Sequence, residues 1–86
     1  DTAFIAASGI DENGAYLLGQ GDAEIVGLAV SRARKVILVA EHQKFVNKSY
    51  CRICPLDKIS MFITDKALTP EQRAMFTDKT EIIVAN

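Results

Sequence analysis

Lys35-Val-Ile-Leu-Val-Ala-Glu-His-Gln-Lys-Phe45 is the most informative stretch of this sequence. It contains an unbroken apolar run, Val36 to Ala40, in which β-branched residues predominate. Such a run predicts a strand that is buried on both faces. Polar residues follow at once, so we expect a loop at the carboxyl end of this strand, where ligands bind in open parallel sheets. Lys44 lies in this loop and is the first candidate for a ligand-binding residue.

The composition is that of one globular domain or of part of one. The chain has 86 residues, of which 49% are hydrophobic and 24% are charged. A chain of this length buries only about 60% of its unfolded surface, so we expect a thin core. The formal net charge of -1 argues against a nucleic-acid-binding domain, which would normally be basic. It also gives no reason to expect contact with a membrane.

The beginning of the sequence indicates that the chain comes from a larger protein. Asp1 is not a Met, and it leads directly into the strand-like run Thr2–Ala7. We therefore expect a fragment or a processed form. No stretch reaches the roughly 18 apolar residues of a membrane span, and no signal-peptide pattern is present.

Cys51 and Cys54 form a Cys-x-x-Cys motif. A zinc site would need two further ligands, and His42 is the single histidine. A redox pair would open a helix beside a strand, whereas this segment is predicted to be extended, with side chains three residues apart on opposite faces. We interpret the pair as two reduced thiols, which is typical of a cytoplasmic protein, and we expect neither a metal nor a cofactor.

The remaining signals alternate between strands and helices. Apolar runs predict strands at 2–7, 36–40, 61–64 and 80–85, and the glycine-containing stretch 8–14 predicts a loop. A helix is expected with Asp22 as its N-cap. One apolar stripe of this helix should be buried; it consists of Ile25, Val26, Ala29, Val30 and Ala33.

A short helical turn is expected at Leu56–Ile59. The sequence Thr69-Pro-Glu-Gln72 is typical of a helix start, and this second helix is expected to reach about Asp78. The alternation of apolar strands and helices predicts an α/β fold with a mainly parallel sheet of about four strands and flanking helices. The order of the strands in the sheet stays open.

Several polar groups could bind a ligand, although each also has an ordinary structural interpretation. The backbone N–H groups of Gly19 and Gly21 could hold a phosphate at a helix start, or the two glycines could form a turn. Asp11 could accept hydrogen bonds from a polyol, or it could be a solvated turn residue. Lys44 could bind a phosphate as a point charge. Asp65 could be a site residue or a turn residue, and we favour the turn. The single histidine is interpreted as structural or solvated, and no nucleophile–base set is present.

The order and spacing of six short motifs resemble the effector-sensing domain of the DeoR family of bacterial transcriptional regulators. These motifs are Asp1–Asp11, Ala23-Glu24, Val36–Ala40, Lys44-Phe45, Pro55–Ile59 and Ile63–Asp65. The resemblance spans essentially the whole chain. It implies that residues 1–86 are a partial sensor domain. The N-terminal helix-turn-helix DNA-binding domain and the first sensor strands would then be absent from this chain.

The sensor fold is similar to that of ribose-5-phosphate isomerase, which implies a three-layer arrangement of the isomerase and CoA-transferase-like type. Ser8–Glu12 resembles the enzyme's Asp-Gly-Ala-Asp-Glu loop, with Ser8 in place of the first Asp. Leu18–Gly21 resembles its Lys-Gly-Gly-Gly loop without the Lys, and Gln43-Lys44 resembles its Ser-Lys pair. The proton-transfer residues are therefore missing, which implies a sensor and not an enzyme. The implied effector-binding residues are Lys44, Asp11, Gly9, Gly19 and Gly21.

Within the DeoR family itself, this chain departs from the usual pattern at two places. Glu41-His42-Gln43 stands where Asp-Ser-Ser is usual, and Val26-Gly27 stands where Lys-Arg is usual. The effector is accordingly expected to be a phosphorylated sugar or a similar metabolite whose identity the sequence leaves open.

The resemblance implies a transcriptional regulator, expected to be a repressor, that contacts DNA only through the absent domain. Family members are typically oligomeric, so a homo-oligomer is expected. Two alternatives stay open: an enzyme of the sugar-phosphate isomerase class, and a module that mainly mediates oligomerisation.

Overall fold

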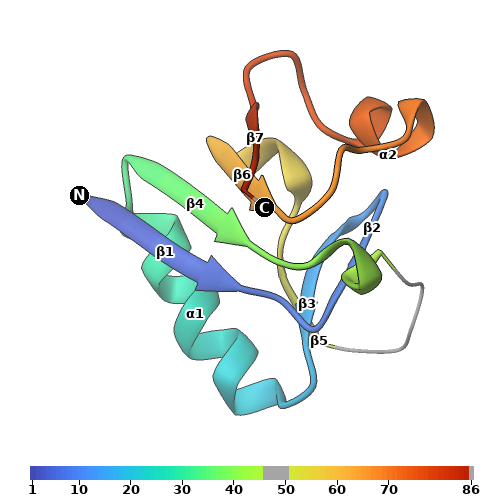
Figure 1. Cartoon of the computed structure of the whole chain (residues 1–86). Helices are drawn as coiled ribbons and strands as arrows, with labels where there is room; N and C mark the ends of the chain where they lie inside the picture. The colour runs from blue at the N-terminus through green and yellow to red at the C-terminus, as the bar shows by residue number, and fades with distance from the viewer. Residues whose placement is uncertain (46–50, 86) are drawn as a thin grey trace.

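A four-stranded parallel sheet forms the centre of the computed structural model, which describes residues 1–45 and 51–85 (Figure 1). The strands follow the order β1-β4-β6-β7. Their bounds are Thr2–Ala6 for β1, Lys35–Val39 for β4, Met61–Thr64 for β6 and Glu81–Val84 for β7. The α/β class and the predicted parallel strands are confirmed.

The helical segments connect these strands. Helix α1 (Gln20–Arg32) precedes β4, the 3-10 turn η1 (His42–Lys44) follows it, η2 (Leu56–Lys58) precedes β6, and α2 (Pro70–Met75) precedes β7. The predicted start of α2 is confirmed in detail, because Thr69 and Gln72 form a reciprocal capping box with Pro70 in the first turn. Its predicted end at about Asp78 is wrong. The helix stops at Met75 because Phe76 is extended and inserts its ring into the core.

A second, antiparallel sheet was not predicted. It consists of β2 (Gly9–Asp11), β3 (Gly14–Leu17) and β5 (Cys51–Cys54), in that order. The predicted loop at 8–14 is therefore wrong: most of it belongs to a hairpin. Gly14 makes the hairpin possible, because its φ is +151° and a side chain there would collide with the carbonyl of Cys54 in β5.

The start and the buried face of α1 also differ from the prediction. Gly19 is the N-cap, and Asp22 lies within the first turn. The helix rests on β5 and β3 as well as on β1, so its buried side turns toward the antiparallel sheet. Ala23 and Val30 are buried as a result, whereas Ile25 of the predicted stripe is 71% exposed and Ala29 is also exposed.

One face of the parallel sheet packs into the core, whereas the other face is less covered within the described part of the chain: Ile37 is buried there, but Phe4 and Val39 are exposed. On the core face Ile5, Leu38 and Phe62 lie side by side and are buried. Strand β1 lies at the edge of the sheet. Its Thr2, Phe4 and Ala6 side chains are exposed, so the expectation that this apolar run is buried on both faces is wrong. Phe4, on its other face, is 71% exposed. In Figure 1, α1 lies on one side of β1 and β4.

Candidate functional site

The turn that carries Lys44 begins directly beyond the carboxyl end of β4. Glu41 is its N-cap residue, and the Lys44 N–H donates to the Glu41 carbonyl at 3.0 Å. Lys44 itself is half-buried. Because β1 and β4 are adjacent and parallel, the segment after β1, which holds Gly9, begins at the same edge of the sheet. The predicted placement of Lys44 at the carboxyl edge is thus confirmed, whereas its role in binding stays a prediction.

Asp65 attaches the beginning of this turn to the neighbouring strand. It directly follows β6, and its Oδ1 accepts the His42 backbone N–H at 2.7 Å. The His42 ring also contacts the same carboxylate, with 2.9 Å between Nδ1 and Oδ2. These hydrogen bonds, first from the backbone N–H and then from the ring of His42, lower the pKa of the Asp65 carboxyl from 3.8 to about 2. The carboxylate is therefore ionised at neutral pH.

Phe45 attaches the other end of the turn to the core. Its ring packs edge-on against Phe62 of β6, with 5.7 Å between ring centroids, and against Phe76 at 6.4 Å. Phe62 and Phe76 are stacked on each other at 5.1 Å. Edge-to-face and offset-stacked aromatic pairs are favourable geometries. Lys44 is consequently held between two fixed points, the Asp65 carboxylate and an aromatic cluster.

A small cavity of about 180 Å³ opens at this carboxyl edge. Residues at and just after the carboxyl ends of β4 and β6 line it, including Ala40, Glu41, Thr64 and Asp65. The exposed surface of this cavity is almost entirely apolar, so an anionic ligand would need a cation beside the cavity. Lys44 is the basic residue of the adjoining turn.

Asp11 lies at the tip of the β2–β3 hairpin, paired with Gly14. Its Oδ1 accepts the Asn13 backbone N–H at 2.8 Å, which is a turn-forming contact. The Asp11 carboxylate also lies near Tyr16: partial burial, and then a hydrogen bond to Asp11, raise the pKa of the Tyr16 hydroxyl. Asp11 thus has a structural task in the hairpin, through its hydrogen bonds with Asn13 and Tyr16.

Gly19 and Gly21 lie at the beginning of α1, beyond the other end of β3. The hairpin tip and the end of β3 are separated by roughly 10 Å at the usual rise of a strand, so these glycines and Asp11 do not form one compact site. Asp22 lies beside them, since a Cβ on Gly19 would be 3.3 Å from its carboxylate. A negative charge at this helix start competes with a phosphate for the same N–H groups.

The two cysteines are free thiols in β5. Burial raises the pKa of the Cys54 thiol to about 11, so this thiol stays protonated at neutral pH and is a poor nucleophile and metal ligand. Within residues 1–45 and 51–85, no three Cys, His, Asp or Glu side chains are grouped in a way that could hold a metal ion. In the same residues, no helix is both long and apolar enough to cross a bilayer.

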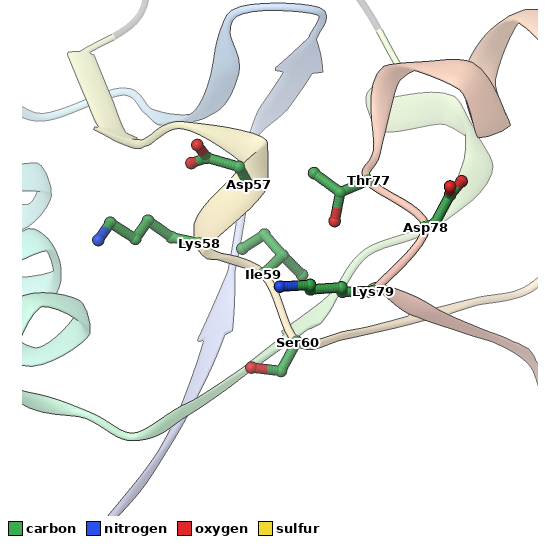
Figure 2. Close-up of a pocket in the computed structure, with 7 residues that line it drawn as sticks. All are labelled: Asp57, Lys58, Ile59, Ser60, Thr77, Asp78 and Lys79. Atoms are coloured by element: carbon green, nitrogen blue, oxygen red, sulfur yellow. The ribbon is translucent and has the colours of Figure 1, made fainter.

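A larger cavity, of about 580 Å³, lies at the opposite, amino edge of β6 and β7 (Figure 2). Lys58 and Lys79 line it together with Asp57 and Asp78. In Figure 2 the Lys58 side chain points away from that of Lys79, so the two ammonium groups do not converge on one position. The hydroxyl of Ser60 already accepts the Val36 N–H at 3.1 Å. We favour the carboxyl edge as the site because the turn that carries Lys44 is attached on both sides, through His42 and Phe45.

The link between His42 and Asp65 was not predicted. Each residue was interpreted alone, one as structural or solvated and the other as a turn residue. The signal was nevertheless present in the sequence, since each follows the carboxyl end of an apolar strand. The sequence does not show that β4 and β6 are neighbours in the sheet, and it is this pairing that brings the two residues together.

Comparison with known proteins agrees with this architecture. Residues 1–66 match the family described as the DeoR C terminal sensor domain. This chain belongs to that family. The match includes β1 to β6 and ends shortly after Asp65, so α2 and β7 lie beyond it.

Two relatives of this DeoR-type sensor domain are named as regulators. The HTH-type transcriptional regulator GlpR of Haloferax volcanii is 32% identical over 74 residues, which cover 85% of this chain and 29% of the relative. The HTH-type transcriptional repressor GlcR of Bacillus subtilis is 30% identical over 66 residues, which cover 77% of this chain and 26% of the relative. The chain thus spans less than a third of either relative. The family and both relatives are regulators and not enzymes.

Proposed function

We propose that this chain is the effector-sensing part of a transcriptional repressor and that its effector is a phosphorylated sugar or a related metabolite. The observation that carries the proposal is the placement of Lys44 in a turn fixed by Asp65 and Phe45 at the carboxyl edge of a parallel sheet. This is the edge at which α/β sheets bind ligands. A lysine presents a compact positive charge that suits a phosphate group. Membership of a sensor-domain family supports the same assignment.

Among the other candidate residues, Gly9 and Asp11 extend the proposed site most directly. Gly9 lies just after β1 and so near the same edge as Lys44. Asp11 would accept a hydrogen bond from a sugar hydroxyl. Gly19 and Gly21 would contribute backbone N–H groups from the start of α1, against the opposing charge of Asp22. We therefore assign the phosphate to Lys44 and not to the glycines.

The domain assignment is also a proposal: residues 1–86 would be one part of a sensor domain, with the DNA-binding domain elsewhere in a longer protein. Its support is the uncovered surface around β1. Parallel strands are usually covered on both faces, yet Phe4 is 71% exposed. A groove of about 330 Å³ also runs between β1 and Ile25, Val26 and Ala29 of α1. Further strands and helices of the same sensor domain would cover this apolar surface.

The test is thermal unfolding of the full-length protein with a panel of sugar phosphates, alongside Lys44→Ala. A ligand at 100 times its dissociation constant should stabilise the protein by about 2.7 kcal/mol. Loss of a charge-assisted hydrogen bond should cost about 1.5–3 kcal/mol of binding, so Lys44→Ala should weaken binding by about 10- to 100-fold.

Lys79→Ala is the matched control, because it removes a lysine from the cavity at the opposite edge. It should bind like the unchanged protein. A compound that still stabilises Lys44→Ala but no longer stabilises Lys79→Ala would show that the site lies at the amino edge. A panel without any stabilising compound would contradict the sensor proposal and would favour a module that mainly mediates oligomerisation.

A further inference from the structure

Asp65 contacts His42, in the turn of the proposed site, at two separate points. Its two carboxylate oxygens contact both the backbone N–H and the ring Nδ1 of His42, at 2.7 and 2.9 Å. Thr64 adds its hydroxyl, 3.3 Å from Oδ1. Two separate points of one residue are thus held by one carboxylate from a neighbouring strand. The position of the turn and the rotation of the imidazole ring are fixed together.

The protonation of the ring follows from this geometry. Because the Asp65 carboxylate is ionised, it can only accept hydrogen bonds, so Nδ1 must carry a proton. The other ring nitrogen, Nε2, then accepts a hydrogen bond when the ring is neutral and donates one when the ring is protonated. Near neutral pH a phosphate group can be either partner, because its second pKa is about 6. Its P–OH group donates a hydrogen bond, and its P–O⁻ oxygens accept one.

The same turn carries Lys44 two residues later. The side chain of His42 is 35% exposed, so part of the ring is accessible from outside. Glu41 at the start of the turn is exposed and directs its backbone carbonyl to the Lys44 N–H. The turn therefore offers an imidazole and an ammonium group on one short, fixed segment.

We propose that Asp65 is a positioning residue of the effector site, and that it orients His42 so that Nε2 binds the anionic group of the effector together with Lys44. This inference rests on the function proposed above. It adds a second contact for the anion and assigns to Asp65 a task beyond ending β6. Asp65 acts on the anionic group through His42.

The experiment measures binding of inorganic phosphate and of ribose 5-phosphate to the full-length protein by titration calorimetry. His42→Ala removes the ring but keeps the backbone N–H that Asp65 accepts. We expect binding about 10-fold weaker, the value for a loss of about 1.4 kcal/mol. Asp65→Ala should weaken binding at least as much. Asp65→Asn keeps one accepting oxygen, so its affinity should lie between that of Asp65→Ala and that of the unchanged protein.

A double variant shows whether Asp65 acts through His42. The effects of substituting two residues in one network are not additive. Asp65→Ala should therefore reduce the binding free energy clearly less in the His42→Ala background than in the unchanged protein. Asp78→Ala is the control, because it removes a carboxylate at the opposite edge of the sheet. Additive losses would show that Asp65 and His42 act separately and would overturn the inference.

A spectroscopic measurement separates orientation from a general loss of structure. The ¹⁵N resonances of the His42 ring, assigned by their absence in His42→Ala, should show a protonated Nδ1. Added phosphate should shift the Nε2 resonance. If Asp65→Ala does not fold, this measurement on the unchanged protein and the Asp65→Asn titration decide the question. An Nε2 resonance that phosphate leaves unmoved would overturn the inference.

The outcomes also separate this inference from the function on which it rests. If binding is lost in Lys44→Ala but unchanged in all His42 and Asp65 variants, the inference about Asp65 is wrong and the proposed function stands. No binding of either compound by the unchanged protein, with no stabilising compound in the sugar-phosphate panel, would remove the proposed function and the inference with it.

Discussion

Asp65 illustrates how a single exposed carboxylate links stability to pH in this molecule. The His42 N–H and ring lower the pKa of its carboxyl to about 2 in the folded state, from 3.8 for the unperturbed group. A group whose pKa is lower when folded stabilises the protein at pH values above its unfolded pKa. The contribution is therefore fully present above about pH 4 and is lost as the pH falls toward 2.

The measurement is urea unfolding of the unchanged chain and of Asp65→Asn at a series of pH values from 6 to 2. The unchanged chain should be more stable at pH 6, and the difference should shrink through the window from about 4 to 2. Comparing the two proteins at each pH removes the effect of other carboxylates that titrate in the same range. A difference that stays constant down to pH 2 would show that the ionised carboxylate does not provide this stabilisation.

At the scale of elements, the β2–β3 hairpin depends on one glycine. Gly14 has a φ of +151°, and a Cβ there would collide with the Cys54 carbonyl of β5. Strained backbone of this kind costs about 1–3 kcal/mol, and the collision adds to it. Gly14→Ala should thus lower the free energy of unfolding by about 2 kcal/mol or more, as measured by urea denaturation.

Gly21→Ala is the matched control for this substitution. Gly21 lies in the first turn of α1, and a Cβ there would meet nothing within 4 Å. Because alanine is a better helix former than glycine, Gly21→Ala should be neutral or stabilising by up to about 1 kcal/mol. Equal losses in both variants would mean that the hairpin has no special need for glycine at position 14.

The sequence predicted the elements whose signals are local, and it missed those that depend on distant partners. The start of α2 was correct because Thr69, Pro70 and Gln72 form the whole signal within four positions. The β2–β3 hairpin was missed because its short strands contain Gly9, Asp11 and Gly14, which are turn-forming residues. Its strand character comes from pairing with β5, far along the chain, and no pattern within the hairpin contains that information.

At the scale of the whole molecule, the uncovered surface of β1 is the main departure from a self-contained domain. Phe4 and Ile25 are each 71% exposed and line the same groove. Apolar patches of this kind promote association, and an unprotected edge strand promotes pairing with another chain. We expect the isolated 86-residue chain to self-associate, and Phe4→Lys or Ile25→Glu to shift it toward the monomer in analytical ultracentrifugation.

Leu18→Lys provides the control for this experiment. Leu18 is 68% exposed but does not line the groove beside β1. Its substitution should leave the association unchanged. If all three substitutions reduce association equally, the contact is a nonspecific one between apolar side chains and not one made through β1.

The candidate site shows the same division between local and distant information. The sequence placed Lys44 correctly, because a loop after an apolar strand is a local signal. It gave Asp11 and the glycines of α1 as members of one site, and the structure separates them along the hairpin. It also left Asp65 and His42 apart, since only the order of strands in the sheet shows that the ends of β4 and β6 are neighbours.

That strand order has a consequence for how the protein is made. In both sheets of the described chain, spatial order follows chain order: β1-β4-β6-β7 in one and β2-β3-β5 in the other. A chain that leaves the ribosome from its N-terminal end can therefore add each new strand to the outer side of the last one. No strand has to be inserted between two that are already paired. Synthesis and sheet growth can proceed in the same direction, which shortens the time during which aggregation-prone intermediates exist.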